Sequence, residues 1–488
     1  MSKVKVDQNA ADFIYMDDIH QPTHDKNLWN ARMKRDTAAS GIPEWEQMRD
    51  LASQIKEHTL THLDHYVQEF VTEATKRGVT VHFAKDDIEH NQTVYDILKS
   101  HHATKIVKSK SMLQEECEMG AFLEARGIEL IETDLGERIQ QLSGEMPSHI
   151  VMPAIHKTTA DVAELFARTI GTDPNEDDPQ QLTEAMRNNA RPKFLEAHAG
   201  LTGANFAIAE TGAFVVCTNE GNADLTASIP PLHIASIGIE KILPKTEDLG
   251  LFIRLLSRSA LGTPATRYTS HFMGPRESGT EMHIVLTDNG RSRRLGMEDF
   301  WRSLKCIRCG ACMNTCPVYR RSGGLAYGAT YSGPIGIIID PTFDESKFSE
   351  LPFHSSLCGS CSEVCPVRIN IAEQIGLWRQ RMVNINESSK TLHYAFGAVE
   401  KVFANPKLFR LAEKAAYYGM KLTPNWLLYH KKLNAWGKHR ELPEIKKETF
   451  RDWYIKNRLK NEFTRRIISG YTAESSRSKG GLSRDTNL

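Results

Sequence analysis

The sequence lacks the features that mark several classes of protein. No apolar run among its 488 residues reaches the roughly 18–20 residues that a membrane-spanning helix needs. Residues 1–18 also lack the basic-then-apolar order of a signal peptide. The chain has no net charge, with 61 Lys and Arg against 61 Asp and Glu, so there is no overall electrostatic case for nucleic acid binding. We therefore expect a cytoplasmic protein with no transmembrane segment and no nucleic acid partner.

Glycine-rich phosphate-binding loops are missing as well. No G-x-G-x-x-G follows an expected strand, and no G-x4-G-K-[ST] occurs. The chain therefore shows no evident flavin, nicotinamide or nucleotide site, and it carries no obvious group that accepts a hydride.

Cysteine is scarce over most of the chain but concentrated in one window. Seven of the nine cysteines lie between Cys306 and Cys365. In a cytosolic protein such clustering indicates metal or redox chemistry rather than disulfides. Cys117 and Cys217 stand alone, and we interpret them as small buried hydrophobic residues rather than ligands.

The first cysteine motif has the spacing C-x2-C-x2-C-x3-C-P, which is that of the bacterial ferredoxins. It consists of Cys306, Cys309, Cys312 and Cys316, followed by Pro317. The two-residue gaps let one tight loop present three thiolates to one four-iron cluster. The fourth cysteine leaves on the following turn and points to the other cluster.

The second motif repeats this pattern with one departure. Cys358, Cys361 and Cys365 match, but the position of the first cysteine holds Ser355. By the crossed-ligand rule, one complete cluster is expected on the first three cysteines of the first motif together with Cys365. The second cluster is then expected on Cys316, Cys358 and Cys361.

The fourth ligand of the second cluster stays open at this point. It could be Ser355, a nearby group such as His354, water, a partner residue or nothing, and an unligated corner can be lost to give a three-iron cluster. We favour a four-iron cluster with three cysteine ligands. The alternative metal is zinc, which typically uses two C-x2-C pairs, but the four-cysteine spacing, the following prolines and the duplication favour iron–sulfur.

Cations surround both motifs. A bound cluster with its thiolates is anionic, so nearby positive charge stabilises the reduced state and raises its potential. The alternative is that these side chains only keep the surface soluble. The residues concerned are Lys305, Arg308, Arg320, Arg321 and Arg368.

Hydrophobic periodicity divides the chain into five regions. We expect a helical N-terminal region (1–78), an α/β domain with a largely parallel sheet (79–296), a cysteine domain (297–375), a basic helical region (376–471) and a disordered tail (472–488). The expected helices are residues 42–77, 86–100, 112–126, 159–169, 247–261 and 297–305, while 322–336 is expected to be loop. The expected strands are residues 79–84, 105–108, 128–132, 149–153, 205–210, 213–218, 232–237 and 282–286.

Charge is unevenly distributed along the chain. Residues 401–488 hold 20 basic and 8 acidic residues, a net of +12, so residues 1–400 carry −12. We interpret this first as solvated helix faces and second as a docking surface for an acidic partner.

Two segments of the α/β domain resemble the lactate-utilisation (LUD) domain. They are residues 203–222, which include GANFAIAETG and TNEGN, and residues 108–112 (KSKSM) with Glu115 and Glu116. With the cysteine motifs and the basic helical end, residues 40–460 resemble the lactate utilization protein B family. The resemblance implies a LUD domain similar to sugar-phosphate isomerase and CoA-transferase-like folds, followed by an α-helical ferredoxin-type dicluster domain.

The resemblance also implies a function. It points to an iron–sulfur electron-transfer subunit in the oxidation of L-lactate to pyruvate, acting with a cysteine-rich electron-transfer subunit and a second LUD-domain subunit. A complete enzyme is less favoured, because no hydride acceptor is evident. The alternatives are a self-contained 2-hydroxy-acid-oxidising enzyme with the substrate in the LUD domain, and a scaffold whose clusters only staple the fold.

Polar residues of the LUD segments are candidates for a ligand site, because α/β proteins bind ligands at strand ends. Lys108 and Lys110 could hold a carboxylate, and Glu210 could act as a base. We favour the alternative, in which these residues build turns and pair with one another. The full candidate set is Lys108, Lys110, Glu210, Thr211, Asn219, Glu220 and Asn222.

Overall fold

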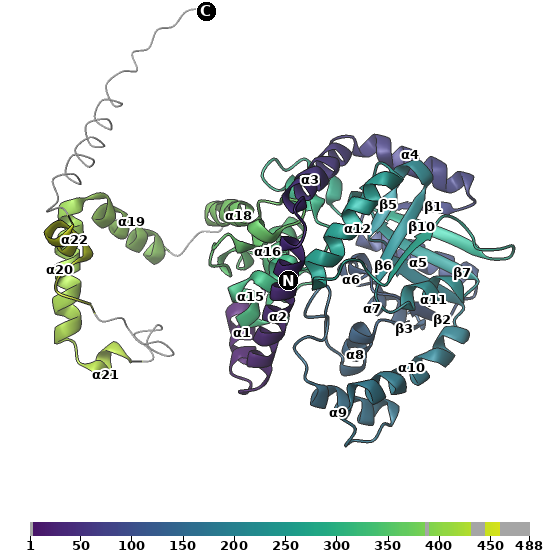
Figure 1. Ribbon diagram of the computed structural model, residues 1–488, viewed down its shortest axis with the longest axis horizontal. Helices are drawn as coiled ribbons and strands as arrows, with labels where there is room; N and C mark the ends of the chain where they lie inside the picture. Colours follow the sequence, from purple (N-terminus) through teal and green to yellow (C-terminus); the bar gives the residue numbers. More distant parts are fainter. Residues whose placement is uncertain (1–2, 386–389, 431–444, 459–488) are drawn as a thin grey trace, which may run out of the picture. The chain divides into compact units, whose positions relative to one another are not determined.

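The computed structural model describes residues 3–385, 390–430 and 445–458 (Figure 1). The chain divides into two compact units, Met1–Ile385 and Asn386–Leu488. The tail expected at 472–488 lies outside the described residues.

The larger unit is built on a six-stranded sheet in which every neighbouring pair is parallel. Its two central strands, β7 and β4, are buried along their whole length, as expected when helices cover both faces of a parallel sheet. All the carboxyl ends therefore meet at one edge. In spatial order the strands are β1 (Thr80–Ala84), β10 (Glu281–Thr287), β7 (Leu232–Gly238), β4 (Ala199–Gly203), β2 (Lys105–Lys108) and β3 (Glu129–Glu132).

A second sheet has four strands, and its β5–β6 and β6–β9 pairs are antiparallel. Its third strand is the apolar run AFVVCT, whose first four residues are buried. Its order is β8 (Ile242–Leu243), β5 (Phe206–Ile208), β6 (Ala213–Thr218) and β9 (Tyr268–Phe272). This sheet follows directly on the main sheet, because β5 starts three residues after β4 ends.

Helices complete the α/β part. The expected helix over 112–126 is two short helices, because Glu118 adopts a left-handed conformation with φ of 51°. The helices are α4 (Leu63–Lys76), α5 (Asp87–Ser100), α6 (Met112–Glu116), α7 (Met119–Glu124), α8 (Leu135–Ser143), α9 (Thr159–Ile170), α10 (Pro179–Leu195), α11 (Asn222–Ser228), α12 (Thr246–Leu261) and α13 (Arg291–Leu295).

The expected strand at residues 149–153 is wrong. The chain turns there because His149 Nδ1 accepts hydrogen bonds from the backbone N–H groups of Val151 and Met152, at 3.0 and 3.1 Å. The strand β4 was not expected, because its sequence AGLTG has little strand propensity. Glycine is nevertheless required at Gly200, where a Cβ would lie 1.8 Å from the carbonyl oxygen of Thr226.

The cysteine region consists of short helices around an apolar centre, in which the rings of Phe300 and Trp378 stack at 4.0 Å. Part of the expected loop at 322–336 belongs to α16, because its isoleucines are buried. The elements are η3 (Trp301–Lys305), α14 (Ala311–Thr315), α15 (Pro317–Ser322), η4 (Leu325–Tyr327), α16 (Gly333–Ile339), η5 (Asp340–Thr342), η6 (Leu351–Phe353), α17 (Ser360–Val364) and α18 (Ile371–Ile385).

Three N-terminal helices pack on this region: α1 (Val6–Ile14), α2 (His20–Ser40) and α3 (Trp45–Thr61). In Figure 1, α1 and α2 lie alongside α15. Buried cations make the contact. Arg35 donates to the carbonyl of Val364 at 3.2 Å, and Arg49 donates to the carbonyl of Cys365 at 3.0 Å. Helices far away in sequence thus hold the second cysteine motif in place.

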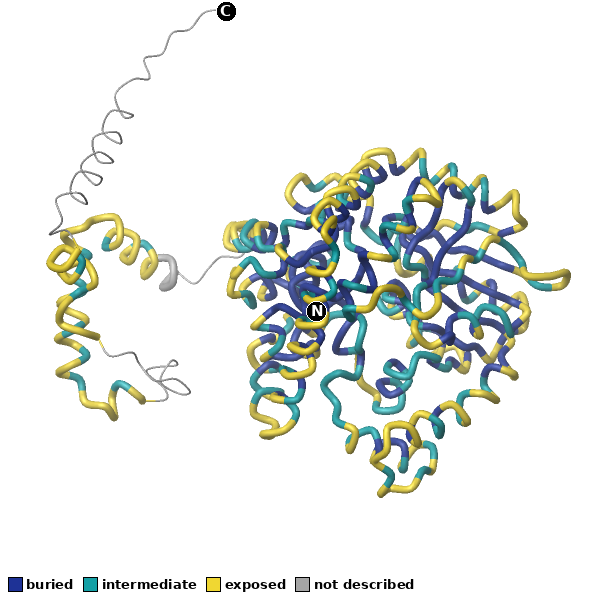
Figure 2. The backbone as a smooth tube through the Cα atoms, viewed as in Figure 1, coloured by how far each residue is buried: buried dark blue, intermediate teal, exposed yellow. Residues whose placement is uncertain are grey.

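The smaller unit contains α19 (Lys390–Ala404), α20 (Pro406–Leu422), α21 (Asn425–Leu428) and α22 (Phe450–Asn457). The last three helices bury none of their residues, and most of the unit's described length is exposed (Figure 2). Within the described ranges of both units, no helix combines the length and the apolar character needed to cross a bilayer.

Candidate functional site

Cys306, Cys309, Cys312 and Cys365 line one small cavity. Three of these thiols are buried and Cys306 is half-buried. The remaining wall is mostly apolar and comes from Ile150, Ile307, Ile335, Val367, Ile369 and Ile371. The structure therefore brings together the four cysteines that the crossed-ligand rule groups.

Backbone N–H groups point at these sulfur atoms. The N–H of Arg308 donates to Cys306 Sγ at 3.4 Å, and the N–H of Ile369 donates to Cys365 Sγ at 3.4 Å. The tight loop needs a left-handed backbone, with φ of 60° at Arg308 and 74° at Gly310. A Cβ at Gly310 would lie 3.0 Å from the His149 ring, so only glycine lets the loop pack this closely against His149.

This environment does not suit free thiolates. Burial raises the pKa of Cys309, Cys312 and Cys365, and each thiolate further opposes ionisation of its neighbours. Without a cation these three thiols stay protonated, whereas a coordinated metal deprotonates a thiol outright. Four convergent sulfurs, donated N–H groups and an apolar wall fit an iron–sulfur cluster.

Cys316, Cys358 and Cys361 form a second set. Burial raises the pKa of Cys361 to about 12, and the neighbouring charges of Cys316 and Cys358 raise it further. Cys358 is exposed, whereas the other two are buried. The negative charge of Cys361 also raises the pKa of Cys312, so the two sets are neighbours.

The backbone of the second motif repeats two left-handed positions of the first motif. Leu357 before Cys358 has a φ of 53°, like Arg308 before Cys309, and Gly359 has a φ of 80°, like Gly310. Ser355 Oγ accepts a hydrogen bond from the N–H of Leu357 at 3.2 Å. This is the same contact that Cys306 Sγ makes with Arg308, so the serine hydroxyl occupies the place of a cysteine sulfur.

His354 is the other candidate neighbour of the second set. Its Nε2 is buried and has no hydrogen-bond partner. Burial lowers the pKa of this imidazole, which keeps it neutral near pH 7. Its ring contacts that of Tyr327 edge-on, with centroids 5.3 Å apart.

The predicted cations around the motifs are mostly paired. Arg320 pairs with Asp25 at 2.7 Å, Arg321 donates to Gln21, and Lys305 lies 3.7 Å from Glu57. Arg368 pairs with both Glu46 and Asp50. Arg308 differs, because its Nη1 is buried without a hydrogen-bond partner.

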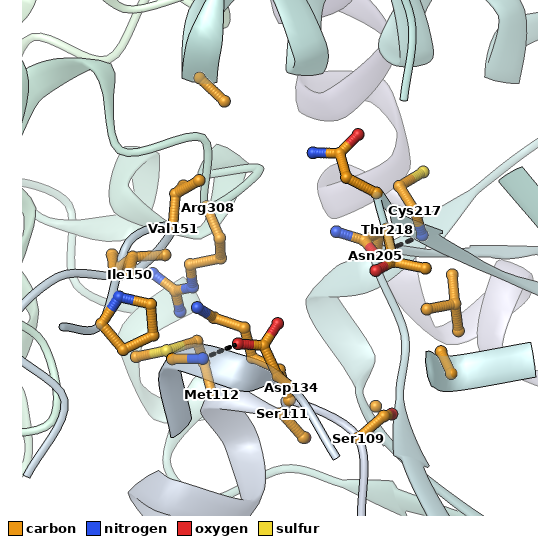
Figure 3. A pocket seen from close by; sticks show the side chains of 18 of the residues that line it. Ser109, Ser111, Met112, Asp134, Ile150, Val151, Asn205, Cys217, Thr218 and Arg308 are labelled. Carbon is orange, nitrogen blue, oxygen red and sulfur yellow. Dashed lines mark hydrogen bonds between the residues drawn. The ribbon is translucent and has the colours of Figure 1, made fainter. Parts of the chain in front are cut away.

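A larger cavity of about 480 Å³ lies at the carboxyl edge of the main sheet. Residues at or just after the ends of β2, β4 and β7 line it, as do residues of β6. Ile150 and Arg308 line this cavity and the four-cysteine pocket alike. Figure 3 shows Arg308, Ile150 and Val151 on one side, Asn205, Thr218 and Cys217 on the other, and Asp134 between them.

The LUD candidates divide into two groups. Lys110, Asn219, Glu220 and Asn222 line the cavity. Lys108 does not: it is buried and pairs with Glu115 and Glu132, at 2.8 Å each.

Glu210 and Thr211 also lie outside the cavity lining. Glu210 accepts from the N–H of Thr246 at 3.0 Å, at the start of α12, and the carbonyl of Thr211 accepts from Arg77 at 2.8 Å. For these two residues and Lys108, the contacts are pairing and turn building, whereas the other four candidates line the cavity.

A carboxyl cluster faces the same cavity. Lys110 pairs with buried Glu137 at 2.8 Å, and Asp134 hydrogen-bonds with both Glu137 and Glu220. Burial and the charge of Asp134 raise the pKa of Glu220 to about 7. Glu220 can therefore hold or release a proton near neutral pH.

Sequence reasoning missed Lys241, which follows the end of β7 and lines the cavity. Burial lowers the pKa of Lys241 to about 8. No motif contains this lysine, so only its position three residues after an apolar strand could have drawn attention to it. Cys117 and Cys217 lie apart from both sets; Cys217 lines the larger cavity, and burial raises its pKa to about 12.

Three known families match successive parts of the chain. The LUD domain matches residues 67–294, the 4Fe-4S dicluster domain matches residues 302–369, and the C-terminal domain of lactate utilisation protein B matches residues 381–458. Lactate utilization protein B from Bacillus cereus strain B4264 is 41% identical over 444 residues, covering 88% of this chain and 91% of that protein. The chain belongs to the lactate utilization protein B family.

A second relative in the lactate utilization protein B family has a similar identity. The protein of that name from Bacillus thuringiensis strain Al Hakam is 40% identical over 88% of this chain and 91% of its own length. The dicluster match indicates that this family member carries iron–sulfur clusters. A crystal structure of a DUF162 family protein from Deinococcus radiodurans aligns with 46% of this chain and 98% of its own, with 12% identity and a TM-score of 0.26.

Proposed function

We propose that this chain is an iron–sulfur electron-transfer subunit in the oxidation of L-lactate to pyruvate. The observation that carries the proposal is the gathering of seven cysteines into two neighbouring sets. The names of the relatives support lactate as the substrate of the system. Bound iron–sulfur clusters accept and release single electrons.

In this proposal Cys306, Cys309, Cys312 and Cys365 hold one four-iron cluster. The chain's own contribution is to exclude water with isoleucine side chains and to direct backbone N–H groups at the sulfurs. Such N–H groups favour the anionic form of a thiolate site and raise its potential.

Cys316, Cys358 and Cys361 hold the second cluster, which we propose to be four-iron with three cysteine ligands. Ser355 would be the fourth ligand; its support is that it makes the backbone contact that Cys306 makes. His354 is the competing ligand, since its buried Nε2 is free.

The partners in the proposal are a cysteine-rich electron-transfer subunit and a second LUD-domain subunit. The lactate-utilisation name of the relatives supports membership in such a system. We also propose a cytoplasmic location and, for the LUD domain, a sugar-phosphate isomerase/CoA-transferase-like fold. The parallel sheet with a cavity at its carboxyl edge supports that fold assignment.

A second candidate is a self-contained 2-hydroxy-acid-oxidising enzyme. The cavity favours it, because Arg308 lines both the cavity and the four-cysteine pocket. The lack of a hydride acceptor in the sequence argues against it.

The deciding experiment is electron paramagnetic resonance of anaerobically reconstituted protein, oxidised and dithionite-reduced, with iron quantified. Two interacting four-iron signals on reduction support the electron carrier. Zinc in place of paramagnetic iron overturns it. L-lactate is then added to the chain alone and to the chain with its partner subunits. Reduction of the isolated chain by lactate selects the self-contained enzyme.

A further inference from the structure

Two positive charges at the large cavity lack a full counter-charge. Arg308 is 91% buried, its Nη1 has no hydrogen-bond partner, and its Nη2 lies 3.8 Å from the nearest carboxylate oxygen, Glu240 Oε1. Lys241 makes no ion pair or side-chain hydrogen bond with any residue that the structure describes. Both line the cavity.

One carboxylate, Glu240, faces this pair and Arg291 together, and the three positive charges lower its pKa. Arg291 Nε donates to Glu240 Oε2, while Glu240 Oε1 makes no hydrogen bond and lies 3.8 Å from Arg308 Nη2. Arg291 in turn pairs with Glu116 at 2.8 Å. One carboxylate does not balance several buried cations, so an anion that enters the cavity gains both Coulombic energy and hydrogen bonds.

Other polar groups of the cavity are suited to a second oxygen on the same ligand. Asn205 Oδ1 accepts from the N–H of Cys217 at 2.8 Å, which leaves the amide N–H groups of Asn205 available. Ser111 and Thr218 add hydroxyl groups (Figure 3). Glu220, which also lines the cavity, adds a carboxyl. The rest of the wall is largely aliphatic, and the volume of about 480 Å³ lies in the usual range of small-molecule sites.

We propose that this cavity binds a small 2-hydroxy or 2-oxo carboxylate, with the carboxylate held by Arg308 and Lys241 and the C2 oxygen held by the polar groups opposite. The inference rests on the proposed function and places its reactant or product on this chain. The site is shared between the α/β domain, which supplies Lys241, and the first cysteine loop, which supplies Arg308.

This position has an electrostatic consequence. Arg308 stands between Cys306 and Cys309, so a bound carboxylate and an added electron at the cysteine site compete for the same positive charge. By linkage, the reduced protein binds the carboxylate more weakly than the oxidised protein does.

The test is anaerobic isothermal titration calorimetry of the reconstituted full chain with L-lactate and pyruvate. The control ligand is L-lactamide, which keeps the hydroxyl but lacks the charge. We expect saturable binding of both acids, no binding of the amide, and at least threefold weaker binding to dithionite-reduced protein. Absence of binding by the acids, or equal affinity in the two redox states, overturns the site.

Variants assign the residues. Lys241→Gln is expected to weaken binding tenfold or more, while iron content stays unchanged because this lysine is outside the cysteine motifs. The matched control is Lys245→Gln on the same segment, where the lysine is exposed and pairs with Glu247 at 3.4 Å. Arg308→Gln tests the second cation, with iron quantified first because the loop could lose metal.

The outcomes separate this inference from the proposed function. If the two cations serve only the cysteine site, the variants shift the resonance signals or the midpoint potential and leave lactate affinity unchanged, which overturns the inference alone. Failure of the proposed function appears instead as loss of the reducible iron signals in the wild-type chain.

Discussion

The two cysteine sets share one backbone but have different surroundings. In both, a left-handed residue precedes the second cysteine and a left-handed glycine follows it. The first set has four thiols, of which three are buried, within an isoleucine-lined pocket beside the large cavity. The second has three thiols, and Cys358 is exposed.

This difference assigns different tasks to one repeated motif. The enclosed set lies beside the cavity where we place the carboxylate, and the open set offers a contact point at the surface. On the proposed function, electrons pass from the enclosed set to the exposed set and from there to a partner. The repeated motif determines the backbone conformation of each loop, whereas the surrounding residues determine how far each set of cysteines is exposed.

The largest expected effect comes from Cys309→Ala. Removing a buried ligand of the complete set leaves three thiols in an enclosed site, and we expect loss of about half of the bound iron. Iron quantification with resonance spectroscopy measures this. Cys117→Ala is the matched control and keeps all the iron; full iron in Cys309→Ala contradicts the ligand assignment.

The second set is expected to lose iron first under oxidation. Exposed Cys358 and the missing fourth thiol give oxidants and chelators access that the first set denies. Timed exposure to ferricyanide and a chelator, followed by resonance spectroscopy, should show two phases with the second-set signal decaying several-fold faster. Simultaneous loss would mean that the two sites are equally protected.

Ser355→Cys should remove much of this difference. The hydroxyl occupies the place of Cys306 Sγ, so a thiol there completes the second set. We expect any three-iron signal to be replaced by a four-iron signal and the faster oxidative phase to slow. Ser356→Cys adds a thiol one residue further on and should do neither; His354→Ala loses iron only if the imidazole is the ligand.

The smallest effect concerns the helices that enclose the first set. Arg49 is 1% exposed and donates to the carbonyls of Cys365 and Glu363. Arg49→Met leaves buried carbonyls without a donor, so we expect a loss of about 1.5–3 kcal/mol in urea unfolding. Arg368→Met, which removes half-exposed ion pairs, should cost about 1 kcal/mol or less. Equal costs would show that Arg49 adds no specific support.

Much of the site follows from spacing. The positions of Cys306, Cys309, Cys312 and Cys365 suffice to predict which thiols meet, because the ferredoxin motif carries its fourth ligand across to the other copy. Regular elements such as β7 and α12 follow from apolar residues that recur at strand or helix spacing.

What could not be predicted depends on contacts distant in sequence. Gly200 and Gly203 conceal β4, because glycine signals a turn unless a neighbouring backbone requires its small size. His149 bends a segment that reads as a strand, through hydrogen bonds from its own neighbours. Lys241 and Arg308 line one cavity only because the α/β domain packs against the first cysteine loop. The local sequence of neither residue indicates this packing.

The crossed cysteine arrangement also sets a schedule for biosynthesis. On the proposed assignment, the site begun by Cys306, Cys309 and Cys312 is finished by Cys365, and Cys316 waits for Cys358 and Cys361. A ribosome that has released only the first motif exposes four thiols with no complete site for iron. The first site therefore gains its fourth thiol only after the second motif is synthesised, and a chain truncated between the two motifs should hold its iron less tightly than the full chain does.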